Sequence, residues 1–103
     1  MAIRMDLPLA RPNCAPPTFE RQTPKCDYER VTTAQQGERF EIHRINDANP
    51  WLRVWDLLRS TYVWSTTNDD LPAATRWTTR HNRAWATQAA AHGISANVND
   101  YLR

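Results

Sequence analysis

The chain has 103 residues, of which 13 are Lys or Arg and 11 are Asp or Glu, giving a formal net charge of +2. This length is typical of one domain, and so small a net charge excludes any argument for nucleic-acid or membrane partners from overall charge. No apolar run approaches the roughly 20 residues of a membrane span, and Arg4 and Asp6 interrupt the start where a signal peptide would be apolar. We therefore expect a protein of the cytoplasm, or of a virion or intracellular complex, that is not secreted.

Prolines are concentrated at the start of the chain. Because proline fixes φ and lacks a backbone donor, this segment is predicted to be neither helix nor interior strand. We predict an extended N-terminal arm over 1–35, lying along a partner, and a small mainly helical domain over 36–103. Five of the seven prolines lie in the first 24 residues: Pro8, Pro12, Pro16, Pro17 and Pro24.

Two cysteines, Cys14 and Cys26, fall in the predicted arm. A disulfide between them would contribute about 3 kcal/mol in an oxidising compartment. Without a secretion signal two free thiols are the favoured state, but the sequence leaves both states open.

A short stretch after the arm has the alternation of a strand. Gly37 marks a turn, and Phe40 and Ile42 place apolar side chains at alternate positions. We predict one short β-strand or hairpin over about 31–45. Its partner would be the stretch 31–33 or a sheet in another subunit.

Asn49 and Pro50 have the signature of a helix start, an N-cap followed by proline at the first helical position. A helix is therefore predicted over about 50–65, with β-prone residues at its end. At 100° per residue one stripe of this helix is apolar. The stripe consists of Trp51, Val54, Trp55, Leu58 and Tyr62.

Asp70 and Pro72 predict the start of a second helix over about 71–92, and Gly93 predicts its end. Ser95 would cap a short C-terminal helix. The expected fold class is therefore mainly α, an antiparallel helical hairpin (about 50–65 and 71–92) plus this short helix. The inner stripe of the second helix would contain Ala74, Trp77, His81, Ala84, Trp85, Gln88 and His92.

In this arrangement the tryptophans of the two stripes join the helices, and Trp64 points away from them. Trp64 is then the indole left for a partner, together with Phe19 and Tyr28 of the arm. These aromatic residues are the predicted partner-binding residues of a protein-protein interface.

Arg76, Arg80 and Arg83 form a second candidate surface on one face of the second predicted helix. With no acid between Asp70 and Asp100, this face suits a phosphate backbone or an acidic partner, or else it is a solvated helix face.

The C-terminal segment 88–103 resembles a helix-turn-helix core, with Ala89 four residues before Gly93 and an Ile-Ser pair after it. It departs from that pattern because Val98 is one place early and because Gln88 and His92 replace apolar residues. The resemblance implies a DNA-binding role, whereas the alternative is an ordinary helix end followed by a terminal helix.

Catalytic and metal-binding patterns are not found. The only glycines, Gly37 and Gly93, form no phosphate-binding loop, and Asp69 and Asp70 are explained by capping. The cysteines and histidines lack the close spacing of metal ligands. We therefore expect no enzymatic activity, no cofactor and no metal.

These observations favour a non-enzymatic protein-protein interaction protein, a structural or accessory subunit of a virion or multisubunit complex. Two alternatives stay open. One is a small nucleic-acid-binding regulator that uses the arginine face or the helix-turn-helix-like segment. The other is a small phage-type inhibitor of a host protein.

Overall fold

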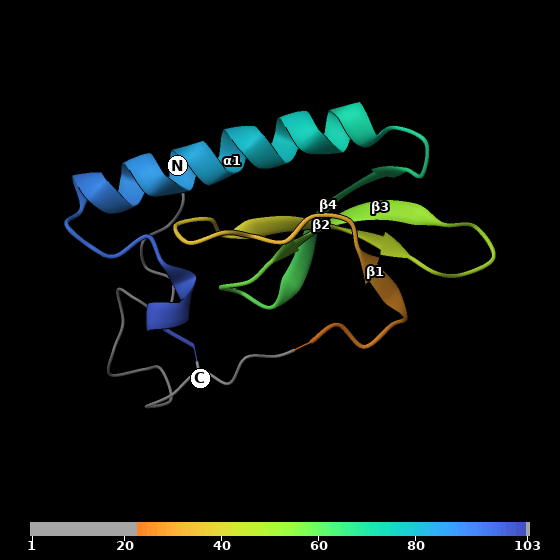
Figure 1. The fold of residues 1–103 in the computed structure, drawn as a ribbon, viewed down its shortest axis with the longest axis horizontal. Coiled ribbons are helices and arrows are strands. Elements are labelled where there is room, and N and C mark those ends of the chain that lie inside the picture. The colour runs from red at the N-terminus through yellow and green to blue at the C-terminus, as the bar shows by residue number, and fades with distance from the viewer. Residues whose placement is uncertain (1–22, 103) are drawn as a thin grey trace.

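The computed structural model describes residues 23–102. Four strands form one antiparallel sheet in the order β1-β2-β3-β4, and a single long helix lies across one face of it (Figure 1). A turn of 3-10 helix, η2, follows the long helix. The elements are β1 (Tyr28–Arg30), β2 (Phe40–Ile45), β3 (Trp51–Asp56), β4 (Thr61–Thr67), α1 (Leu71–Ala91) and η2 (Val98–Asp100).

The predicted mainly α fold is wrong, because residues 50–65 form a hairpin of strands and not a helix. Leu52 and Val54 are fully buried and Arg53 between them is exposed, which is the alternation of a strand. The helical period of 3.6 residues, from which the apolar stripe was derived, was therefore the wrong period for this segment. The chain reverses at Leu57–Ser60, where Ser60 has a φ of 55°.

The strand expected within 31–45 is present as β2, but its neighbour differs from the predicted one. β1 pairs with it from inside the range expected for the arm, with Tyr28 opposite Ile45. The stretch 31–33 instead forms a loop that remains bonded to β2, where the Val31 and Thr32 N–H groups donate to the Ile42 carbonyl at 2.9 and 3.1 Å.

The helix expected over 71–92 is present as α1, with the expected ends. Asp70 Oδ1 accepts a hydrogen bond from the Ala73 N–H at 3.2 Å, and Gly93 has a φ of +66°. Its inner stripe differs from the predicted one, since Trp77 and His81 are half-buried at its margin. The buried residues are Ala74, Thr78, Asn82, Trp85 and Ala89.

The expected C-terminal helix is only the 3-10 turn η2, and within residues 23–102 no α-helix follows Gly93. The segment after Gly93 is held against the core, because Trp85 Nε1 donates to the Ala96 carbonyl at 2.8 Å. Val98 is 3% exposed and belongs to the core. This arrangement lacks the recognition helix of a helix-turn-helix motif.

The core lies between α1 and the sheet and contains a buried polar cluster. Asn82 on α1 accepts from the Arg39 and Phe40 N–H groups at 2.8 Å each and donates to the Phe40 carbonyl at 3.0 Å. The Arg39 guanidinium makes two hydrogen bonds to the Asp56 carboxylate, at 2.9 and 2.8 Å. The helix and the central strands are therefore joined by directional bonds as well as by apolar packing.

We expect Asn82→Ala to lower the free energy of unfolding by about 3 kcal/mol, because three buried backbone groups of Arg39 and Phe40 lose their partner. Urea unfolding followed by tryptophan fluorescence measures this loss. The control is Arg76→Ala, an exposed position of the same helix, with an expected change within about 0.5 kcal/mol. Equal effects of the two substitutions would contradict the assigned role of Asn82.

Candidate interaction surface on the sheet

The sheet face opposite α1 carries a layer of aromatic and charged side chains. The pairing places Arg30 opposite His43, His43 opposite Arg53 and Arg53 opposite Ser65, so that all four lie on one face. Glu41, Trp51 and Trp55 share it because they alternate with core residues in β2 and β3, and Tyr28 shares it because it pairs with Ile45, which lies opposite Trp51. This face therefore combines residue types that are enriched at interfaces.

Its centre is a buried hydrogen-bond network of Glu41, His43 and Tyr62. His43 Nδ1 lies 2.9 Å from the Tyr62 hydroxyl, and His43 Nε2 lies 2.6 Å from Glu41 Oε2. The second Glu41 oxygen accepts from the Ala34 N–H at 3.0 Å, while Arg30 Nε donates to Oε2 at 2.9 Å. The network joins three strands and the loop after β1 across this face.

Aromatic rings enclose the network. Tyr28 stacks on the imidazole of His43 with a centroid distance of 4.5 Å, and Trp55 lies on its other side at 6.0 Å. The Trp55 and Tyr62 rings meet edge to face at 4.8 Å. His43 and Glu41 are each 1% exposed, so the rings fix their orientation and keep water away from them.

The electrostatics of the network keep Glu41 ionised and Tyr62 neutral. Burial alone would raise the pKa of Glu41, but hydrogen bonds from His43 and the Ala34 N–H and the charge of Arg30 lower it below 4.5. Burial raises the pKa of Tyr62 above its usual value of 10.0, and the neighbouring Cys26 thiol adds to this effect. Tyr62 therefore remains a hydroxyl at neutral pH.

The space beside the network is too small for a substrate. The cavity lined by Tyr28, Glu41, His43 and Trp55 has a volume of about 40 Å³, which is room for one or two water molecules. Within residues 23–102, no group of three or more His, Cys, Asp or Glu side chains is arranged to hold a metal ion. The arrangement suits a rigid support for the sheet surface.

The exposed part of this face lies beside strand β4. Trp51 is 45% exposed at the start of β3, and Arg53 projects next to it with its guanidinium 5.5 Å from the centre of the Tyr62 ring. Ser65 and Thr67 lie opposite them on β4 and are exposed. We call Trp51, Arg53, Ser65 and Thr67 the β4 patch.

β4 is also an edge strand. Among residues 23–102 it pairs only with β3, on one side, and it is seven residues long, whereas the opposite edge strand, β1, has three residues. The segment Thr61–Thr67 contains no charge, proline or glycine. Edge strands are often protected by charged residues, by proline or by a β-bulge. β4 has neither charge nor proline, and its pairing with β3 is irregular only opposite Val54 and Trp55, so the stretch 64–67 is the unprotected template for another strand.

The predicted partner-binding aromatic residues do not form one surface in the structure. Trp64 is half-buried on β4 and stacks on Trp77, which stacks in turn on His81, with centroid distances of 5.8 and 3.6 Å. Tyr28 is half-buried against His43. Phe19 lies outside the described residues.

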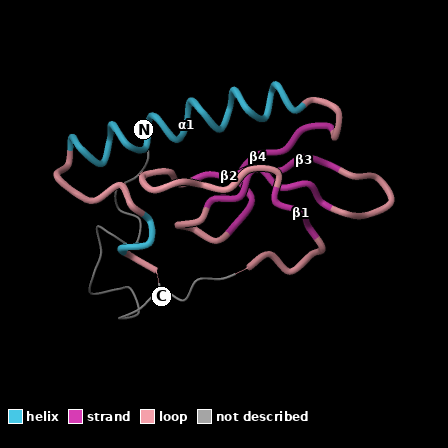
Figure 2. The backbone as a smooth tube through the Cα atoms, viewed as in Figure 1, coloured by secondary structure: helices cyan, strands magenta, loops and turns pink. Residues whose placement is uncertain are grey.

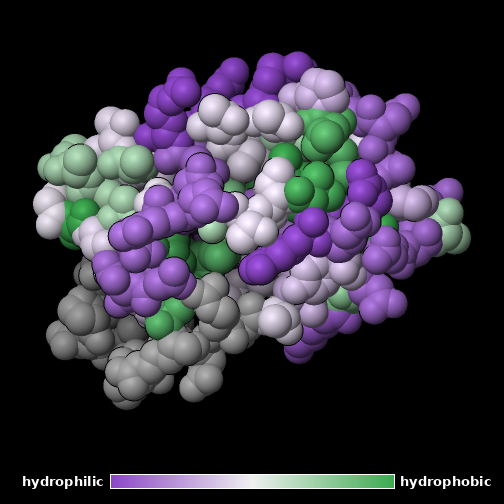
Figure 3. Space-filling view, viewed as in Figure 1, coloured by the Kyte–Doolittle hydropathy of each residue, from purple (hydrophilic) through white to green (hydrophobic). Residues whose placement is uncertain are grey.

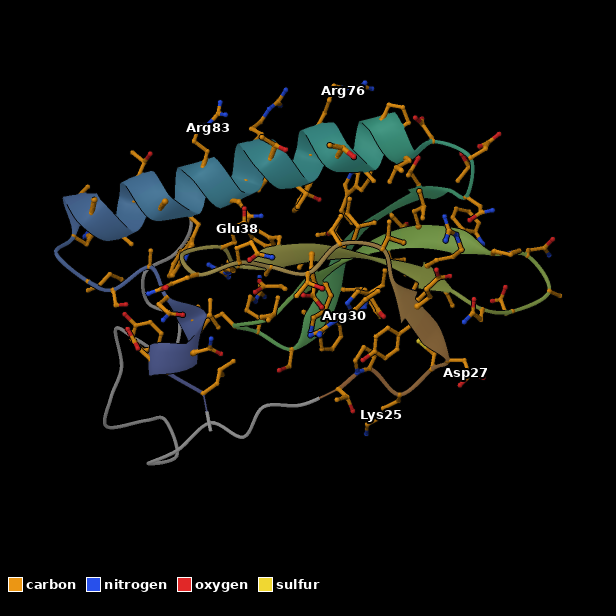
Figure 4. All side chains as sticks on the ribbon, viewed as in Figure 1. Lys25, Asp27, Arg30, Glu38, Arg76 and Arg83 are labelled. Atoms are coloured by element: carbon orange, nitrogen blue, oxygen red, sulfur yellow. The ribbon has the colours of Figure 1, made fainter. Side chains whose placement is uncertain are left out.

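The three predicted arginines are exposed on the outer side of α1, where hydrophilic side chains line the top of the molecule (Figure 3). Arg76 and Arg83 are labelled in Figure 4 and project from the helix away from the sheet. Arg80 is exposed between them on the same helix. None of the three makes an ion pair with any residue from 23 to 102.

Sequence reasoning missed Trp51, Arg53 and the Glu41–His43 pair as members of one surface. The alternation in β2 was a usable signal, because it places Glu41 and His43 on the face opposite Phe40 and Ile42. Trp51 was assigned to a helix stripe, which concealed its exposure at a strand end.

No protein-family model matches the chain, and comparisons with curated proteins and with solved structures give no match. Among residues 23–102, no helix is both long enough and apolar enough to cross a membrane.

The lowered pKa of Glu41 predicts an acid-sensitive contribution to stability. Because the folded-state pKa lies below 4.5, the carboxylate stabilises the fold above that pH, and the contribution disappears as the pH falls through the folded-state value. In Glu41→Gln, the difference in unfolding free energy between pH 7 and pH 3 should be smaller than in the wild type. Urea titrations at the two pH values measure it.

Glu29→Gln is the matched control, since the Glu29 side chain is 58% exposed and should leave the wild-type pH dependence intact. If Glu41→Gln declined with acid as steeply as the wild type, the network would not be the acid-sensitive element.

Proposed function

We propose that this protein is a non-enzymatic interaction protein, an accessory or structural subunit of a larger intracellular assembly or virion. The observation that carries the proposal is the long uncharged edge strand β4 beside the exposed Trp51 and Arg53. A partner protein adds an extended segment to β4 as a fifth strand. Main-chain hydrogen bonds supply affinity in this mode of binding, and neighbouring side chains supply specificity.

The contacts around the β4 patch support this assignment. Trp51 offers a large rigid anchor that loses little conformational entropy on binding, and Arg53 is already oriented over Tyr62. On the same face, the Glu41–His43–Tyr62 network joins β2 to β4. The surface is thus preorganised, which reduces the free-energy cost of association.

A photo-crosslinking side chain placed at Thr67 tests the proposal in native extract. We expect a protease-sensitive adduct with another protein, reduced at least about tenfold by Trp51→Ala, because loss of a central aromatic anchor typically costs about 2 kcal/mol of binding free energy. Ser65→Lys, which adds a charge to the strand edge, should reduce it in the same way. The unfolding free energy of both variants should stay within about 1 kcal/mol of the wild type.

The matched control carries the crosslinking side chain at Thr87, an exposed position of α1. Adducts from Thr87 but not from Thr67 would contradict the β4 proposal. A crosslink between two copies of this chain would show that β4 binds a second copy, which would also contradict binding of a different protein.

A second candidate function is nucleic-acid binding through Arg76, Arg80 and Arg83, because these exposed cations have no acidic partner within residues 23–102. In that case the affinity for generic duplex DNA falls steeply with salt, and replacing the three arginines by Gln reduces the slope of log affinity against log salt by about 3. Absence of binding at low salt excludes this function.

A further inference from the structure

A groove lies at the opposite side of the molecule from β4. It is formed between α1 and the loop that connects β1 to β2, which passes beneath the helix (Figure 2). Its volume is about 500 Å³, within the usual range of sites for small ligands. Phe40 and Ile42 contribute apolar surface to it.

Threonine side chains occur on both walls. Each threonine hydroxyl donates one hydrogen bond and can accept others, so the walls suit a ligand whose donors and acceptors alternate. The Thr78 hydroxyl is buried without a hydrogen-bond partner in the described part of the chain. The threonines are Thr32 and Thr33 from the loop and Thr75, Thr78 and Thr79 from the helix.

Two opposite charges line the groove. Arg83 lies at its outer rim, where the side chain projects away from the sheet, and Glu38 lies on the loop beneath the helix (Figure 4). No ion pair joins them or ties either one to another residue within 23–102. One Glu38 oxygen accepts from the Gln35 N–H at 2.8 Å, which fixes the carboxylate on its wall. A ligand with both a carboxylate and an ammonium group would match these charges.

The length of the groove limits the ligand. The helical residues that line it run from Thr75 to Ala86, which at 1.5 Å per residue is about 16 Å. An extended peptide advances about 3.3 Å per residue, so at most four or five residues fit along the wall.

We propose that this groove binds a short free peptide of about four residues. Its carboxylate pairs with Arg83, its ammonium group pairs with Glu38, and its main-chain amides bond to the threonine hydroxyls. The site is separate from the β4 patch, and it stands whether or not β4 binds a partner strand.

Titration of the ¹⁵N-labelled full chain with tetra-alanine, followed by NMR, tests the proposal. We expect saturable shifts of the Gly37 and Thr79 amides, with an affinity in the millimolar range or tighter. Tetra-alanine with acetylated and amidated ends lacks both charges and should bind at least about tenfold more weakly. Equal binding of the blocked peptide, or no saturable shift up to about 10 mM free peptide, would overturn the proposal.

Substitutions test whether the charges of Arg83 and Glu38 contribute to peptide binding, as distinct from general effects on the fold. Arg83→Gln and Glu38→Gln should each weaken binding of tetra-alanine at least about fivefold, and Glu38→Gln keeps a carbonyl oxygen for the Gln35 N–H. Arg76→Gln, on the same helix but outside the groove, should leave the affinity unchanged. Equal affinities of all three variants and the wild type would assign the shifts to nonspecific binding and overturn the site.

Discussion

The contact between Asn82 and the start of β2 determines the arrangement of the whole molecule. A single carboxamide satisfies two N–H groups and one carbonyl of Arg39 and Phe40, as a neighbouring strand would do. Asp56 extends the same cluster, because it pairs with Arg39 and accepts from the Leu58 and Arg59 N–H groups of the next turn. One buried cluster thus fixes α1, the start of β2 and the β3–β4 turn relative to one another.

The position of α1 leaves the two edges of the sheet unequal. The helix packs more closely on β2 than on β4. The Asn82 side chain hydrogen-bonds to the Phe40 carbonyl, as the backbone of a neighbouring strand would. On that side the groove lies between the helix and the loop that connects β1 to β2. On the other side Trp77 of α1 stacks on Trp64 of β4. The backbone edge of β4 has no partner strand among residues 23–102.

The sequence predicts local features of this fold better than its pairing. The boundaries of α1 could be predicted because Asp70, Pro72 and Gly93 act on their own backbone. Asn49 and Pro50 carry the same kind of signal, yet strand formation over 51–67 depends on a partner strand and on packing, which no local pattern reveals. For the same reason His43 could be placed on a strand face, but not beside Tyr62.

The irregularity in the β3–β4 pairing makes the two ends of β4 structurally different. The register shifts between Val54 and Trp55, so that Val54 lies opposite Trp64 but Trp55 lies opposite Tyr62, and Val63 is the extra residue. This shift places Tyr62 on the face where its hydroxyl reaches His43. The remainder, from Trp64 to Thr67, pairs with β3 in regular register next to Trp51 and Arg53, and this is the part of the edge to which the proposed partner strand would be added.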